Sequence, residues 1–400
     1  MQILYLGLVF CTIIGILAFG RPLYQAVIGG LLVTAVLFQI PFSEGIHRIL
    51  MPLTEWSSFS ILLIFYCITF LQRVLEARSQ IKLAQRDLDR IFNNRRVNAS
   101  GAPLFIGLLP SAAAMILCSD IVKDATEGYL KPEEQASAAS WFRHIPESSL
   151  PTYTTVLLMV SLSGVALTDF LVGMIIPFLT LALIGYVAYL RRLPKETGVE
   201  QNGSKKQACF DLIRHLWALI LILVLIIGFG LDVLWAVLIA IIASVIIYRI
   251  TRAELKKIVV SSFEKKILLN TYLVLVLKEF IAYTGVLNLL PDALAVLPLP
   301  PYLIFAVLFF VVAVISGSTA AIAMGTPLAF AVIPGGMPLV VYLMCITHAA
   351  SQVSPTHVCL MVASEYFNVS LGKMIRKTIP LSLAFCALMT VYYQVLLLLS

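Results

Sequence analysis

Hydroxyl side chains gather at two apolar places in this sequence where glycine or proline interrupts the run. One is Ser316-Gly317-Ser318-Thr319, and the other is Ser354-Pro355-Thr356. Backbone that leaves helical geometry inside a membrane must be buried in protein or line a wet cavity. The N-terminal ends of half-helices attract anions, whereas C-terminal carbonyls attract cations such as Na⁺. Both places therefore predict binding sites for a small solute and a coupling ion.

Related patterns occur in the first half of the chain, where Gly107 and Pro110 precede a run of small residues and Ser149 lies close to Pro151-Thr152. Small residues also serve as plain helix-packing surfaces in membranes, so packing alone is the alternative at each motif. The predicted substrate-binding residues are Ser111, Ser149, Thr152, Ser316, Gly317, Ser318, Thr319, Ser354, Pro355 and Thr356. The residues predicted to bind a coupling ion or proton are Gly107, Pro110, Thr326, His348 and Glu279.

Ionisable residues near these motifs are few. His348 precedes Pro355-Thr356 by seven residues, and His144 precedes Pro151-Thr152 by the same seven. A histidine can carry a proton near neutral pH, but a structural histidine is the competing interpretation. Glu279 follows Lys278 inside an apolar segment, where buried charge suggests function or a structural salt bridge to another helix.

The mixed-charge stretch 120–147 is expected to be a solvated helical excursion, with Asp120 close enough to the first tip to touch a ligand.

The composition restricts the class of protein that can hold these motifs. The 400 residues are 60% hydrophobic and only 12% charged, with a mean hydropathy of +0.98. A soluble domain is nearer half apolar and a quarter charged, so we predict an all-α polytopic membrane protein. The net charge is +7, and the basic residues lie in loops between apolar runs. This position indicates anionic lipid rather than nucleic acid as their partner. Seven cysteines show no disulfide or zinc spacing, and no cofactor beyond Na⁺ or H⁺ is expected.

About 20 apolar residues are needed for a helix to cross a ~30 Å hydrocarbon layer. Two apolar stretches, about 102–119 and 301–335, fit re-entrant hairpins better than crossings. With both termini outside, nearly all of the 28 Lys and Arg fall on the inner side, as the positive-inside rule requires. The predicted crossings are approximately 3–20, 22–40, 56–75, 150–168, 169–190, 212–229, 233–249, 268–287, 338–361 and 379–399.

A shift of about 207 residues superimposes these elements, which predicts an internal repeat. Residues 1–190 would form the first half and 212–400 the second, joined by a cytoplasmic linker at 191–211. Each half would hold five crossings, one re-entrant hairpin and one broken helix. Because five is odd, the second half must enter the membrane in the opposite direction, giving an inverted repeat of the kind found in secondary transporters.

Three segments, GLLPSAAAMILCSDIVKDA (107–125), SGSTAAIAMGTPLA (316–329) and SPTHVCLMVASEYFNVSLGKMIRKTIP (354–380), resemble an uncharacterised prokaryotic membrane family. That family is placed in the ion transporter superfamily with gluconate, citrate, dicarboxylate and arsenite permeases. The resemblance implies that hairpin tips near Ser111 and Ser316–Thr319 and breaks near Thr152 and Ser354–Thr356 hold an organic anion and coupling Na⁺ or H⁺. The chain lacks the Ser-Asn-Thr signature of the dicarboxylate branch, so no substrate is named.

These patterns predict a secondary active transporter in the cytoplasmic (inner) membrane that moves a small, anionic organic solute with Na⁺ or H⁺. A cation/proton antiporter is the nearest alternative, and Glu279 would then act alone because no Asp-Asp pair is present. An intramembrane enzyme is less favoured because protease and zinc-helix signatures are missing from the sequence. A homodimer is expected by analogy with such relatives.

Overall fold

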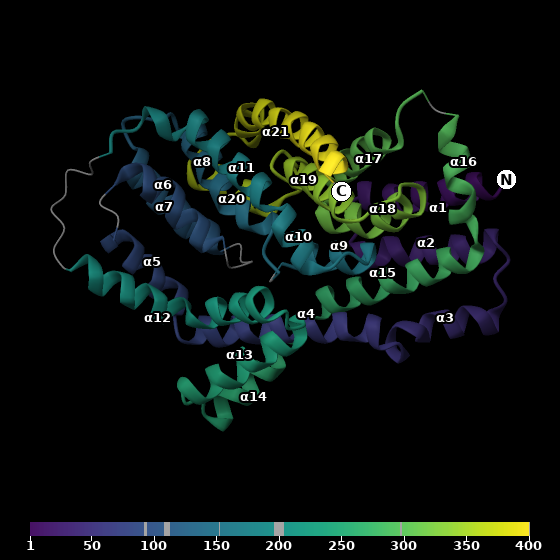
Figure 1. The fold of residues 1–400 in the computed structure, drawn as a ribbon, viewed down its shortest axis with the longest axis horizontal. Helices are drawn as coiled ribbons and strands as arrows, with labels where there is room; N and C mark the ends of the chain where they lie inside the picture. Colours follow the sequence, from purple (N-terminus) through teal and green to yellow (C-terminus); the bar gives the residue numbers. More distant parts are fainter. Residues whose placement is uncertain (92–93, 108–112, 152, 196–203, 297, 400) are drawn as a thin grey trace.

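A computed structural model describes the chain apart from residues 92–93, 108–112, 152, 196–203, 297 and 400, and all regular structure in that part is helical (Figure 1). Among the described residues, five helical stretches are long and apolar enough to cross a membrane. Large apolar side chains stay exposed on several of them, as a lipid-facing surface requires. The chain is therefore a polytopic all-α membrane protein. The five stretches are α4 (Trp56–Ala77), α10 (Leu167–Gly173) with α11 (Ile175–Ala188), α12 (Lys205–Leu223) with the π-helical turn η3 (Val224–Gly228), α15 (Lys265–Thr284) and α21 (Leu371–Leu399).

The remaining helices are shorter, and most of the apolar ones lie inside the predicted crossings. The predicted crossing 338–361 consists of two helices, α19 and α20, with a non-helical break at 352–357. The helix bounds are α1 (Gln2–Ala18), α2 (Leu23–Leu37), α3 (Phe42–Thr54), α5 (Gln80–Ile91), α6 (Arg95–Ile106), α7 (Ala113–Thr126), α8 (Pro132–His144), η1 (Ile145–Ser148), α9 (Thr154–Ser163), η2 (Leu190–Arg192), α13 (Val233–Ile247), α14 (Arg252–Ser261), η4 (Val286–Leu289), α16 (Leu290–Ala295), α17 (Pro301–Ser316), α18 (Ser318–Val332), α19 (Met337–Ser351) and α20 (Val358–Tyr366).

The helices form two groups that pack mainly within themselves. The α4 layer consists of α1–α5 and α12–α15, and the hairpin layer consists of α6–α11 and α17–α21. In Figure 1, α3, α4 and α12 run along the lower part of the molecule, and the hairpin layer lies above them. Contacts between the layers are fewer, and α5 with α6 and α1 with α17 make most of them. The hairpin layer holds both serine-rich motifs identified in the sequence.

Both stretches predicted as hairpins are pairs of helices packed against each other, α6 with α7 and α17 with α18. The second turn is made by Gly317 alone, whose φ of +88° is a conformation that residues with a Cβ rarely adopt. Gly325 then lets α18 approach α17, because a Cβ there would overlap the ring of the fully buried Phe309. Glycine thus makes the turn and the close packing of this hairpin.

The stretch 120–147 is only in part the solvated excursion that its charges suggest: Asp120, Lys123, Asp124, Glu127 and Lys131 are exposed, but the second helix is not. Its second helix, α8, is buried between α6, α7, α20 and α21, and every residue from Glu134 to His144 is buried. Alanine and serine fill the middle of this helix, so neighbouring helices can approach it closely. Its charged end is compensated, because Glu134 lies 3.2 Å from Arg192 and 3.8 Å from Lys377. The burial of α8 therefore could not be predicted from the mixed charges of this stretch.

Helices that the predicted shift of about 207 residues would superimpose exchange contact partners. In the α4 layer, α2 packs against α15, while α4 packs against α13. In the hairpin layer, α7 contacts α20 while α18 contacts α9, and α8 contacts α21 while α19 contacts α10. The two halves are therefore interleaved rather than being separate domains.

The polar helix α14 is fastened to the end of α4, at the edge of the molecule from which α13 and α14 project (Figure 1). Thr251 and Glu254 form a capping box at its start. Arg78 donates hydrogen bonds of 3.0 and 3.2 Å to the Glu254 carboxylate. These bonds, with those from Thr251, lower the pKa of the Glu254 carboxyl to about 2. The contact therefore stays ionised at physiological pH.

Replacing Gly325 with alanine should destabilise the second hairpin, since the added methyl group meets the immobile Phe309 ring. Overpacking of this kind typically costs about 1–3 kcal/mol, so we expect a lower melting temperature for detergent-purified Gly325→Ala. Gly7→Ala is the matched control, because a Cβ on Gly7 meets no atom within 4 Å. Adding Phe309→Leu to Gly325→Ala should recover part of the loss. Equal melting temperatures for the two single variants would contradict this packing.

Candidate functional site

A polar cavity of about 550 Å³ lies where the two layers meet. The α4 layer contributes the turn between α1 and α2, including Arg21, and Asn270 of α15. The hairpin layer contributes the tip between α17 and α18, the break before α20, and Glu147 and Thr155 from either side of the break between α8 and α9. Five segments that are far apart in the chain therefore form one cavity.

Six of the predicted substrate-binding residues line this cavity. They come from the two motifs that the sequence singles out most clearly, and they are Ser316, Gly317, Ser318, Thr319, Ser354 and Thr356. The hairpin tip and the helix break that were predicted separately are therefore neighbours.

Ser354 ties the break to the hairpin. Its hydroxyl is buried, donates a 2.7 Å hydrogen bond to the carbonyl of Val314 in the last turn of α17, and lies 2.9 Å from the Thr356 hydroxyl. The Thr356 amide donates to Ser354 Oγ at 3.3 Å. The last carbonyls of a helix have no partner within it, so Ser354 supplies one for α17. Ser354 in the cavity wall therefore has a structural role.

A similar contact closes the first half of the site. The Tyr153 hydroxyl, beside the break between α8 and α9, donates to the carbonyl of Gly107 at the end of α6. A Cβ on Gly107 would overlap the Arg143 carbonyl, so this glycine permits close approach of α6 to α8. In each half, one side chain at the break bonds a backbone carbonyl at the end of the first hairpin helix.

Four oxygen atoms of the cavity wall are buried and make no hydrogen bond with any residue that the structure describes. They are Glu147 Oε2, Thr155 Oγ1, Asn270 Oδ1 and Ser316 Oγ. Buried polar atoms in native proteins nearly always have a partner, and each unpartnered one costs about 1–3 kcal/mol. Four such atoms in one cavity are available as partners for water or for a bound ligand. Oxygen-only donors of this kind suit a hard cation.

The cavity wall also provides positive charge. Ser318 and Thr319 begin α18, a 15-residue helix whose N-terminus carries partial positive charge into the cavity. Arg21 lines the same cavity from the α4 layer and is exposed. First-turn amides, two hydroxyls and a guanidinium are groups that hold carboxylates or other oxyanions.

Several predicted residues lie away from the cavity. Ser149 and Pro355 belong to the breaks but do not line it, and Gly107 supports Tyr153 instead. Thr326 is fully buried and donates to Met159 Sδ at 3.2 Å, which packs α18 against α9. His348 is buried beside Gln352, and Glu279 is half-buried on α15 without an ion pair to any described residue. Pro110, Ser111 and Thr152 fall outside the described residues.

Residues missed at first complete the site: Arg21, Glu147, Thr155, Asn270, His357 and Cys359. Two of them, Arg21 and Asn270, have sequence features that point to a functional role. Arg21 is a single basic residue between two apolar segments, and Asn270 is an amide within a predicted crossing, where polar groups are costly. Glu147 was hidden because its surrounding charges suggested a solvated stretch.

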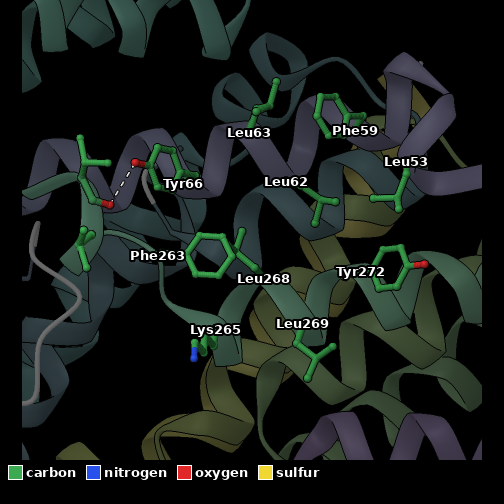
Figure 2. Close-up of a pocket in the computed structure, with 12 residues that line it drawn as sticks. Leu53, Phe59, Leu62, Leu63, Tyr66, Phe263, Lys265, Leu268, Leu269 and Tyr272 are labelled. Atoms are coloured by element: carbon green, nitrogen blue, oxygen red, sulfur yellow. Dashed lines mark hydrogen bonds between the residues drawn. The ribbon is translucent and has the colours of Figure 1, made fainter. Parts of the chain in front are cut away.

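A larger cleft of about 1100 Å³ lies within the α4 layer, between α4, α14 and α15, but it offers little chemistry. Figure 2 shows leucine and phenylalanine side chains around it, with Lys265 as its only charged residue. Its tyrosines are used structurally, since Tyr66 donates to the Val259 carbonyl at 3.1 Å and Tyr272 to that of Ile49 at 2.7 Å. The polar cavity is therefore the candidate site.

Alanine substitutions should separate support from binding. Ser354→Ala removes a buried hydrogen bond from the Val314 carbonyl, a loss of about 1–3 kcal/mol, and should lower the melting temperature of the purified protein. Ser318→Ala should leave the melting temperature unchanged, because the Ser318 hydroxyl bonds no other described residue. If Ser354→Ala has the melting temperature of the wild type, the hydrogen bond between Ser354 and the Val314 carbonyl does not contribute to stability.

Comparison with known proteins gives one result for the whole chain. No curated protein matches it significantly. The model of one family matches residues 6–396, which is nearly the complete sequence and includes every element of the cavity. The chain belongs to this family, described as a protein family of unknown function, DUF401.

Proposed function

We propose that this protein is a secondary active transporter that moves a small organic anion across the cytoplasmic membrane, coupled to Na⁺. The observation that carries the proposal is the polar cavity between the two layers, which combines donors for an anion with acceptors for a cation. A transporter needs this combination, because the ion and the solute must bind together to be moved together.

The anion would bind at the start of α18. The hydroxyls of Ser318 and Thr319 and the first-turn amides lie on one side, and Arg21 lies across the cavity on the α4 layer. A carboxylate accepts hydrogen bonds from all these groups, and a guanidinium pairs with it in two-pronged fashion. The cavity volume of about 550 Å³ suits a small solute rather than a peptide or a lipid.

The coupling ion would bind to the unpartnered oxygens. Glu147 supplies the negative charge, and Thr155, Asn270 and Ser316 supply neutral oxygens. Na⁺ lowers the cost of burying Glu147 in a membrane protein and adds positive charge near the anion. Each ligand would thus favour binding of the other, which is the physical basis of symport.

Alternating access is supported by the arrangement of the helices. The cavity walls come from both layers, so sliding of the hairpin layer against the α4 layer would carry the hairpin tip and the breaks past Arg21 and Asn270. The exchanged contacts of α2 with α15 and α4 with α13 are those expected of two inverted repeats. With the predicted topology, Arg21 lies at the inner side and the cavity opens inward.

A cation/proton antiporter remains the alternative function. Glu147, the carboxylate that lines the cavity, would then alternate between a proton and a cation, in place of the Glu279 expected from the sequence. We also propose that the protein is not an enzyme: Ser140 and His144 are in contact at 3.2 Å, but both are buried and neither lines the cavity.

A thermal-shift screen of detergent-purified protein tests the symport proposal. The panel would contain carboxylates, sugar acids and inorganic oxyanions, each with Na⁺ or with choline. A ligand at 100 times its dissociation constant stabilises the folded state by about 2.7 kcal/mol, so a true substrate should raise the melting temperature clearly, and only with Na⁺. A hit would then be tested by uptake into proteoliposomes under a Na⁺ gradient.

Two variants and a control locate the effect. Arg21→Gln should abolish the rise in melting temperature caused by the anion. Asn270→Ala should abolish the effect of Na⁺, so that the anion gives the same melting temperature with Na⁺ as with choline. Arg252→Gln, which removes an exposed arginine at the start of α14 far from the cavity wall, should behave like the wild type. A flat response to every anion, with a melting temperature that responds to cations and pH, would favour the antiporter instead.

A further inference from the structure

Two histidines and a cysteine meet beside the cavity, and the symport proposal uses none of them. One ring nitrogen of His144, one of His357 and Cys359 Sγ lie within 4.8 Å of one another, and the two Nε2 atoms are the closest pair of the histidines. His144 ends α8 in the first half of the chain, whereas His357 and Cys359 lie at the start of α20 in the second. From this geometry we infer a binding site for a thiophilic divalent transition metal, with Zn²⁺ as its best ligand.

The orientation of His144 favours metal binding. Its Nδ1 lies 2.6 Å from the backbone carbonyl of Ser140, an atom that can only accept, so Nδ1 carries the proton and donates it. The Nε2 lone pair of His144 therefore points at His357 and Cys359. Ligand histidines in metal sites typically have this second contact to a carbonyl or carboxylate, which fixes both the tautomer and the ring.

The distances require little rearrangement. The two Nε2 atoms are 2.9 Å apart, and two nitrogens bound to one tetrahedral Zn²⁺ at 2.0–2.1 Å would be roughly 3.3 Å apart. The rings already meet edge to face, with centroids 4.7 Å apart, so a small outward shift of His357 makes room for the ion. His357 is only partly buried and lines the cavity, which permits that shift.

A fourth ligand and charge compensation are also present. Glu147 Oε2 lies 3.7 Å from His144 Nε2 and makes no hydrogen bond within the described structure. A Cys359 thiolate and the Glu147 carboxylate together balance the two charges of Zn²⁺. Arg143 is the nearby group that opposes a cation, and it is also close to Tyr153 and Cys118. Two neutral imidazoles, one thiolate and one carboxylate form a normal zinc ligand set.

Three of the four ligands, Glu147, His357 and Cys359, line the cavity, so an ion can reach the site from it. A bound Zn²⁺ would join the end of α8 to the start of α20, which come from opposite halves of the chain. It would also occupy Glu147, which the symport proposal assigns to Na⁺. Zn²⁺ is therefore expected to stabilise the hairpin layer and to compete with Na⁺.

Cobalt titration of the purified full-length protein tests the site without any transport assay. Tetrahedral Co²⁺ bound to a thiolate gives a sulfur-to-metal charge-transfer band and intense ligand-field bands, and we expect both in the wild type, with displacement by Zn²⁺. Cys359→Ser should lose the charge-transfer band. His144→Gln and His357→Gln should each weaken Zn²⁺ binding by about 100-fold, the upper end of the loss seen when even outer-shell contacts are removed.

Cys118→Ser is the matched control, because Cys118 is a buried cysteine near Cys359 that is not in the cluster. It should keep the charge-transfer band. If the wild type shows no such band at saturating Co²⁺, or if Cys359→Ser retains it, the inference is wrong regardless of how the histidine variants fold. Because only metal binding is measured, either result leaves the symport proposal to its own test.

Discussion

The structure depends on how it satisfies backbone groups where helices stop inside an apolar protein. A helix that ends in such surroundings leaves carbonyls and amides without partners, and water is not available to replace them. Ser354 bonds the carbonyl of Val314 in one half, and Tyr153 bonds that of Gly107 in the other. Each contact joins a helix break to a hairpin, and Ser354 makes its contact in the wall of the cavity.

The same constraint explains what could be predicted from the sequence. Helix interruptions inside apolar segments need glycine, proline and hydroxyl residues, so the tip at Gly317 and the break at 352–357 lie where their residue types indicate. The all-α membrane class follows from composition in the same way. These features depend on local chemistry, and local chemistry can be recognised in one sequence.

The parts that could not be predicted depend on packing between distant segments. Nothing near Arg21 or Asn270 shows that both line a cavity with Ser316, because their proximity results from how the two layers meet. Helix α8 was misjudged for the same reason. Its charges suggest water, but Glu134 is compensated by Arg192 and Lys377, which are remote in sequence. Charge alone therefore does not distinguish a solvated helix from a core helix whose partners come from elsewhere.

The burial of α8 has a consequence for how the chain is made. This helix packs against α20 and α21, and Ser137 contacts the Met374 carbonyl across 237 positions of sequence. During synthesis the first half enters the membrane before those partners exist. The Arg143 and Glu134 side chains then lack their final contacts and are expected to stay at the lipid–water boundary or against the insertion machinery. Helix α8 can take its final place only after α21 has been translated. The first half expressed alone should therefore be recognised as unfinished by cellular quality control, although five of the ten predicted crossings lie in it.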